Sequence, residues 1–249
     1  MTPLELLEAF RTLTKDLLQK AKPAARCTEV LRKVNARADA ASAAMVGARA
    51  IKLACREGCS FCCRHLKVDA HAHEILYAAE HIRAHLDTEQ IAGIVARSRA
   101  HAEALAPMTL PEQIHSRQPC PLLVDDRCIA HEARPRSCRN HHATDVKLCE
   151  ESFNKSDPTL PGTEDGQLKS FGSIVWIAVK RAFVEEGYDA ETYEFGSAIG
   201  EALENPATAR RWRDKKRAFS AAVRAKDSEQ MLEMDNRLAE VIRRNQATR

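Results

Sequence analysis

The chain has 249 residues, 44% of them hydrophobic, so it is long enough to bury a core, and its formal net charge of +3 indicates no strongly charged partner. Its longest apolar run, residues 174–179, is far shorter than the ~20 residues that cross a bilayer, which argues against a membrane partner. Residues 1–25 contain Glu5, Glu8 and Asp16, and they fit neither a secretory signal nor a transit peptide. We therefore expect a cytoplasmic protein.

Apolar residues recur at helical spacing through most of the chain. In chain order, the predicted helices cover residues 2–22, 24–53, 69–86, 88–105, 167–186, 190–204, 207–224 and 228–244. No segment predicts a strand. The fold class is therefore all-α, with an irregular cysteine-rich core between helical flanks. We divide the chain into an N-terminal helical hairpin (1–53), a metal-binding core (54–153), a linker (154–166) and a C-terminal helical region (167–249).

Cysteine and histidine gather in one window of the chain. Eight of the nine cysteines lie between Cys55 and Cys149, and all ten histidines lie between His65 and His142. Cys27 lies outside this window, on a predicted helix, where a small core residue is expected. Thiolates and imidazoles are the ligands of zinc and iron–sulfur sites, and reduced thiols are the rule in the cytoplasm. The window therefore predicts a metal site.

The cysteines form two blocks. The first block lies within residues 55–63, where Gly58 permits the tight turn that would bring its sulfurs together. The second block is spread over residues 120–149. We predict that zinc or iron, including an iron–sulfur cluster, joins the two blocks. The predicted ligands are Cys55, Cys59, Cys62, Cys63, Cys120, Cys128, Cys138 and Cys149.

Other side chains of the window allow more than one interpretation. Arg134, Arg136 and Arg139 could donate to metal-bound sulfurs or serve as ordinary surface charges. His141 and His142 lie among the predicted ligands and are candidates for an auxiliary ligand. Cys62 and Cys63 are adjacent, so their side chains would normally diverge. They could share one site, serve two sites, or leave one thiol spare.

These residues resemble the YkgJ-like cysteine-cluster family, described as a zinc- or iron-chelating domain. The resemblance rests on Cys59-Ser-Phe-Cys62-Cys63, on Pro119-Cys120-Pro121, and on the stretch from Cys128 to Arg139 that contains Arg134-Pro135. It covers about residues 50–150 and departs from the family at Ala130 and His131, where an aliphatic residue and a tyrosine are usual. One branch of the family resembles the flagellin lysine N-methylase, thought to use an iron–sulfur cluster.

Two functions remain open at this stage. The first is a structural metal module, in which saturated zinc scaffolds the helices for a protein or peptide partner. The second is an iron or iron–sulfur enzyme that modifies a protein or peptide by methyl transfer or redox chemistry. A radical S-adenosylmethionine enzyme is disfavoured, because that class alternates strands and helices. Nucleic acid is also disfavoured, because the charges of residues 210–217 would spread around a helix that buries Trp212 and Phe219.

Overall fold

The computed structural model describes residues 1–23, 25–155 and 164–220, and helices dominate them, as the all-α prediction requires. The helices are α1 (Pro3–Lys20), α2 (Arg26–Ala48), α3 (Phe61–His65), α4 (Ala72–His85), α5 (Thr88–Leu105), α6 (Leu110–His115), α7 (Arg136–Arg139), α8 (Val146–Lys155), α9 (Gly166–Glu185), α10 (Phe195–Glu204) and α11 (Ala207–Arg213), with a short 3-10 turn, η1 (His131–Ala133). The strands are β1 (Asp69–His71), β2 (Leu123–Val124), β3 (Arg127–Cys128) and β4 (Thr192–Glu194).

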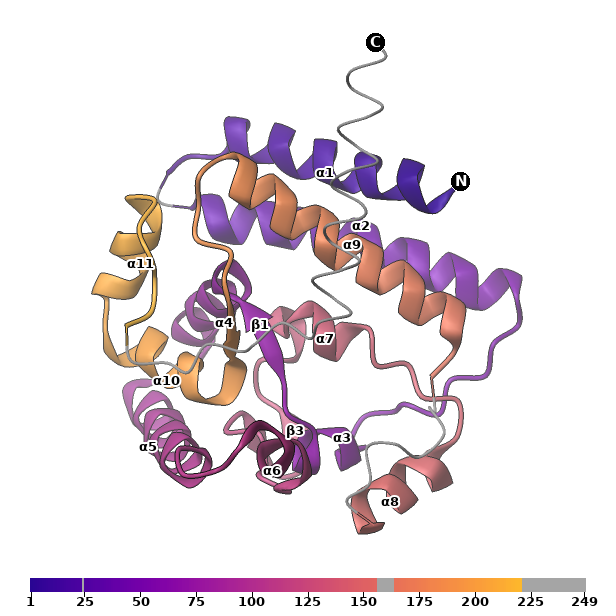
Figure 1. Ribbon diagram of the computed structural model, residues 1–249, viewed down its shortest axis with the longest axis vertical. Helices are drawn as coiled ribbons and strands as arrows, with labels where there is room; N and C mark the ends of the chain where they lie inside the picture. The colour runs from indigo at the N-terminus through magenta and orange to yellow at the C-terminus, as the bar shows by residue number, and fades with distance from the viewer. Residues whose placement is uncertain (24, 156–163, 221–249) are drawn as a thin grey trace.

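The N-terminal hairpin forms as predicted, except that its second helix ends at Ala48 and not at residue 53, because Ala50 adopts a left-handed backbone conformation. Thr2 caps α1 by accepting a hydrogen bond from the Glu5 backbone, and Pro3 occupies the first turn, where its missing N–H costs nothing. The chain then reverses around Pro23, and α2 packs against α1. Helix α9 packs against both, so three helices lie side by side (Figure 1).

A second group of helices consists of α4, α5 and α10, with α10 packed against the other two. The short strands that precede α4 and α10 correct the prediction that no strand is present. Strand β1 pairs antiparallel with β4, with Asp69 opposite Glu194. Asp69 is therefore a strand residue and not the cap of the third helix. The prediction that a helix begins at residue 190 is also wrong, because residues 192–194 are extended and Glu194 caps α10 through its carboxylate.

The C-terminal region is only partly as predicted. Helix α11 ends at Arg213 and not at residue 224, because Lys215 adopts a left-handed backbone conformation with φ of 59°. Trp212 and Phe219 are both buried, as expected. The predicted helix over 228–244 lies outside the described residues. Helix α8, which was not predicted, extends to Lys155, so the predicted linker begins inside it.

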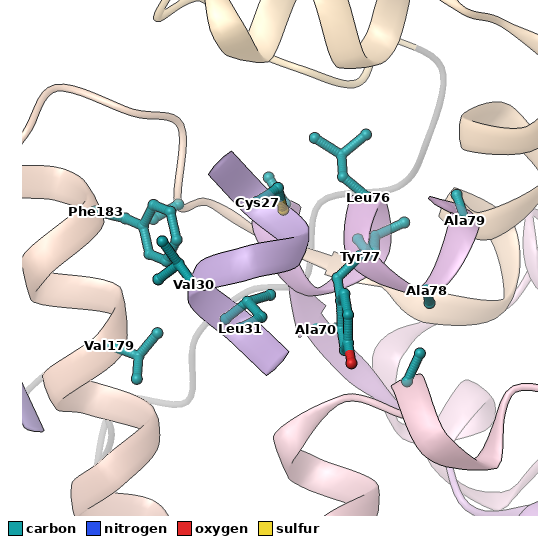
Figure 2. Close-up of a cluster of buried hydrophobic side chains, with 14 of the residues drawn as sticks. Cys27, Val30, Leu31, Ala70, Leu76, Tyr77, Ala78, Ala79, Val179 and Phe183 are labelled. Carbon is teal, nitrogen blue, oxygen red and sulfur yellow. The ribbon is translucent and has the colours of Figure 1, made fainter. Parts of the chain in front are cut away.

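The core lies between the two helical groups. Figure 2 shows Cys27 and Val30 of α2 facing Leu76 of α4 on one side and Phe183 of α9 on the other. Cys27 is buried, and its thiol donates to the His73 carbonyl over 3.0 Å, which confirms it as a core residue. None of the described helices is long and apolar enough to cross a membrane.

The contact between α10 and α5 gives a direct test of this packing. A Cβ added at Gly200 would lie 2.4 Å from Ser98 Oγ and 2.7 Å from Ser98 Cβ, so the helices would have to separate. We expect Gly200→Ala to lower the free energy of unfolding by about 1–3 kcal/mol. Gly47→Ala on α2, where the new Cβ meets nothing within 4 Å, should leave stability unchanged or raise it by up to about 1 kcal/mol. Urea unfolding of both variants measures the difference, and equal stabilities would contradict the packing.

Candidate metal centre

The first cysteine block is an irregular turn followed by helix α3. Gly58 has a φ of 79°, which confirms that it makes the turn, and the Cys59 N–H donates to the Arg56 carbonyl. Cys62 and Cys63 lie on α3. Their sulfurs do not diverge: the two Sγ atoms are 3.9 Å apart. Two thiolates on one tetrahedral zinc, with bonds of about 2.3 Å, would stand about 3.8 Å apart. The two sulfurs therefore have the spacing of two ligands of one tetrahedral metal ion.

The second block is built on a hairpin and a short helix. Strands β2 and β3 pair around a two-residue turn, Asp125 and Asp126, with φ angles of 48° and 59°. Left-handed residues at both turn positions match the twist of a tight hairpin, and Asp tolerates them. This pairing places Cys128 opposite Leu123. Cys138 lies on α7, which begins after Pro135.

Hydrogen bonds join the two blocks at several points. The Cys120 N–H donates to the Cys63 carbonyl over 2.8 Å. The Ser60 hydroxyl donates to Asp126 over 2.6 Å, and Arg64 pairs with the same carboxylate. The blocks therefore meet in the fold, although helices α4 and α5 separate them in the chain.

The thiols of both blocks gather around Cys62. The thiols of Cys55, Cys63, Cys128 and Cys138 lie close enough to Cys62 to interact with it electrostatically. Cys120 lies close to Cys128 and Cys138 in the same way, and Cys59 lies close to Cys55. The eighth predicted ligand, Cys149, is buried on α8, which packs against the helix of Cys62 and Cys63. In the part of the chain that the structure describes, no three Cys, His, Asp or Glu side chains stand in ready metal-ligand geometry. The donors are therefore gathered, and the side chains must still turn to share an ion.

The buried thiols are held in the protonated form. The hydrogen bond between the Cys62 and Cys63 thiols, together with burial, raises the pKa of Cys62. Burial raises the pKa of Cys138 to about 12 and also raises the pKa of Cys120. A thiol must lose its proton to bind a metal or to act as a nucleophile. These cysteines are therefore poor nucleophiles by themselves, and a soft cation that displaces their protons fits the donor set.

The three arginines of the second block have different roles. Arg134 lies near Cys55, Cys128 and Cys138, where its charge favours their thiolates. Arg136 and Arg139 instead reach Asp39 on α2, at 3.3 Å and 2.5 Å. Only Arg134 of the three therefore faces the sulfurs, and the other two fasten α7 to the helical core.

Two buried carboxylates beside the cysteines were missed by the sequence analysis. Glu74 on α4 accepts hydrogen bonds from the Arg136 backbone at 2.6 Å and from Trp176 Nε1 at 3.0 Å. Glu164 accepts from His141 Nδ1 at 3.0 Å. Burial opposes ionisation of Glu164, but the bonds from His141 and Lys169 outweigh it and lower its pKa to about 2. Glu74, with Ile75, is part of the family resemblance, but no role was predicted for it, and Glu164 belongs to no recognisable motif.

The cysteines gather at the centre of the chain, and thiols are side chains that can bind a soft metal ion. Residues 54–159 match the family model CxxCxxCC, whose description reads "Putative zinc- or iron-chelating domain". The matched range contains all eight predicted ligands, so the resemblance to a zinc- or iron-chelating cysteine domain is confirmed for this part of the chain, whereas the YkgJ-like name stays a prediction. No curated protein and no solved structure matches the chain.

Proposed function

We propose that the protein binds zinc or iron through thiolates of both cysteine blocks and that the metal locks residues 55–63 onto residues 120–149. The meeting of the two blocks around Cys62 carries this proposal: the Cys62 and Cys63 sulfurs are 3.9 Å apart, and the Cys120 N–H donates to the Cys63 carbonyl. The family description supports the same cations. It names chelation and no reaction, so the proposal includes no enzymatic step.

The fold makes such a metal site favourable. Closing the loop between Cys63 and Cys120 would cost chain entropy that grows only slowly with length, and the fold has already brought the two ends together, with α4 and α5 both packed against α10. Binding of a structural zinc is worth about 10–16 kcal/mol in zinc-finger peptides. The fold already brings the two blocks together. Metal binding therefore needs only to reorient the cysteine side chains. We place the protein in the cytoplasm, which keeps such thiols reduced.

Eight thiolates are enough for two four-sulfur sites, or for one cluster with several metal atoms. Zinc is the occupant we expect in protein prepared in air, and an iron–sulfur cluster would require preparation without oxygen. Eight thiolates carry more negative charge than two divalent ions can neutralise. The positive charge of Arg134 therefore supports both zinc and an iron–sulfur cluster.

Metal analysis of the full chain tests the proposal. Protein purified without oxygen should contain zinc or iron in whole-number ratio to the chain, and an iron–sulfur cluster would also give acid-labile sulfide and a brown colour. Cys62→Ser and Cys138→Ser should each lose most of the metal. Cys27→Ser changes a buried thiol outside the two blocks and should keep the wild-type content. Wild-type protein that contains no more metal than the Cys62 and Cys138 variants would overturn the proposal.

A further inference from the structure

His141 lies in the short segment between α7 and α8, beside the thiols. Its backbone N–H donates to the Cys138 carbonyl over 3.4 Å, and its own carbonyl accepts the Cys55 thiol over 3.7 Å. Its ring is close enough to Cys62 for each to affect the ionisation of the other. One imidazole is therefore held where thiols of both blocks meet.

The orientation of this ring is set by a carboxylate from another segment. Residues Ala143 and Glu164 form an antiparallel bridge, and this bridge brings Glu164 Oε1 to 3.0 Å from His141 Nδ1. Both side chains are largely buried, with 22% of His141 and 14% of Glu164 exposed. Lys169 binds the other carboxylate oxygen of Glu164 over 2.5 Å, which fixes that side chain in turn. The ring therefore has one nitrogen occupied and a defined direction.

This is the arrangement in which histidine binds metals in proteins. A metal-ligating imidazole almost always donates its second ring N–H to a carboxylate or a carbonyl, and this bond selects the tautomer whose other nitrogen carries a free lone pair. With Nδ1 donating to Glu164, the free lone pair of neutral His141 is on Nε2. His142, the neighbouring residue, lies near Arg134 and Asp39 instead.

We propose that His141 is a ligand of the metal held at Cys62, through Nε2, and that Glu164 is its positioning residue. This inference rests on the proposed metal binding. It gives the centre at least one mixed sulfur and nitrogen site, in which a neutral ligand replaces a thiolate and reduces the negative charge around the cation. The competing interpretation is an ion pair between His141 and Glu164 that only stabilises the loop.

Cobalt(II) in place of the native metal separates these interpretations, because its visible and near-ultraviolet bands report coordination number and thiolate ligands. We expect His141→Ala to weaken cobalt binding by the full chain more than about 100-fold and Glu164→Gln to weaken it about 10- to 100-fold. His141→Cys should restore binding and add sulfur-to-cobalt charge-transfer intensity. His142→Ala is the matched control and should bind and absorb like the wild type.

The outcomes separate a failure of the His141 assignment from a failure of the proposed metal binding. A purely structural ion pair predicts that the wild type and the His141→Ala protein share one cobalt spectrum and one affinity. That result, or a His141→Cys protein without added charge-transfer intensity, would overturn the role of His141 and leave the thiolate site standing. Wild-type protein that binds neither cobalt, zinc nor iron(II) would overturn the proposed function itself.

Discussion

Removing the metal from the full-length protein is expected to loosen residues 54–66 and 117–149 while the helical core keeps its structure. Those two segments contain few large buried apolar side chains; the buried apolar residues are Pro121, Leu122, Ala130, Ala133, Pro135, Ala143 and Cys149, and Leu122 is the largest of them. The hydrophobic core is formed mainly by α1, α2, α4, α9 and α10, and these helices carry none of the eight cysteines of the two blocks. Hydrogen exchange should therefore speed up in the two cysteine segments after chelation and stay slow in α2, α9 and α10.

The size of the effect follows from linkage. A ligand at about 1,000 times its dissociation constant stabilises the folded state by about 4 kcal/mol, and a chain of this size gains about 2–4 °C in thermal midpoint per kcal/mol. We expect chelation to lower the midpoint by about 8–16 °C with little loss of helical circular dichroism before melting, since α3 and α7 are short. A Cys62→Ser, Cys138→Ser double variant should not respond to the chelator. Unchanged exchange in the wild type would contradict the proposal that the metal locks the blocks.

The helices with a strong apolar period could be predicted, and the strands could not. The helix over residues 88–105 is confirmed at both ends, because Asp87 caps it and the stripe of Ile94 and Leu105 is buried. Strands β1 and β4 have three residues each, with no alternating pattern to detect. Their extended backbone depends on each other, across more than 120 residues of chain. Pairing at that separation leaves no local signal.

The histidines show a different limit. Their clustering with the cysteines predicted a shared role, yet His71 and His73 are fully buried in the core. Each ring stacks at 4.1 Å, His71 on Trp176 and His73 on Phe183, and burial lowers the pKa of His73 to about 3. An imidazole is both a ligand and a flat aromatic ring. The sequence shows where histidines occur but not whether each serves as a ligand or as an aromatic ring. Only the fold distinguishes His71 and His73 from His141.

The arginines could not be sorted by sequence for a related reason. Arg134 and Arg136 are two residues apart and flank Pro135, so the chain carries both to the same place. Which one faces the sulfurs is decided by Asn35 and Asp39 on α2, which bind the Arg136 guanidinium. That pairing depends on how the N-terminal hairpin packs onto α7, a tertiary contact.

Replacing Glu74 should destabilise the protein more than any other single carboxylate change we predict. Its side chain is buried and accepts three hydrogen bonds, from the His71 backbone at 2.9 Å, the Arg136 backbone at 2.6 Å and Trp176 Nε1 at 3.0 Å. These donors belong to the start of α4, the start of α7 and the middle of α9. Glu74→Ala leaves all three buried without an acceptor. Removing one partner of a buried charged network costs about 3–5 kcal/mol, which we expect here as a loss in unfolding free energy.

Two further variants, one conservative and one at an exposed position, serve as comparisons for Glu74→Ala. Glu74→Gln keeps one acceptor oxygen and the volume of the side chain, so it should cost about 1–3 kcal/mol. Glu103→Ala removes an exposed glutamate from α5 and should change stability by no more than about 0.5 kcal/mol. Urea unfolding of the metal-free proteins measures the three values. Since the Arg136 backbone begins the helix that carries Cys138, Glu74→Gln should also weaken metal binding, whereas Glu103→Ala should not. Equal stability of the Glu74→Ala and Glu103→Ala proteins would show that this carboxylate does not join the cysteine domain to the helical core.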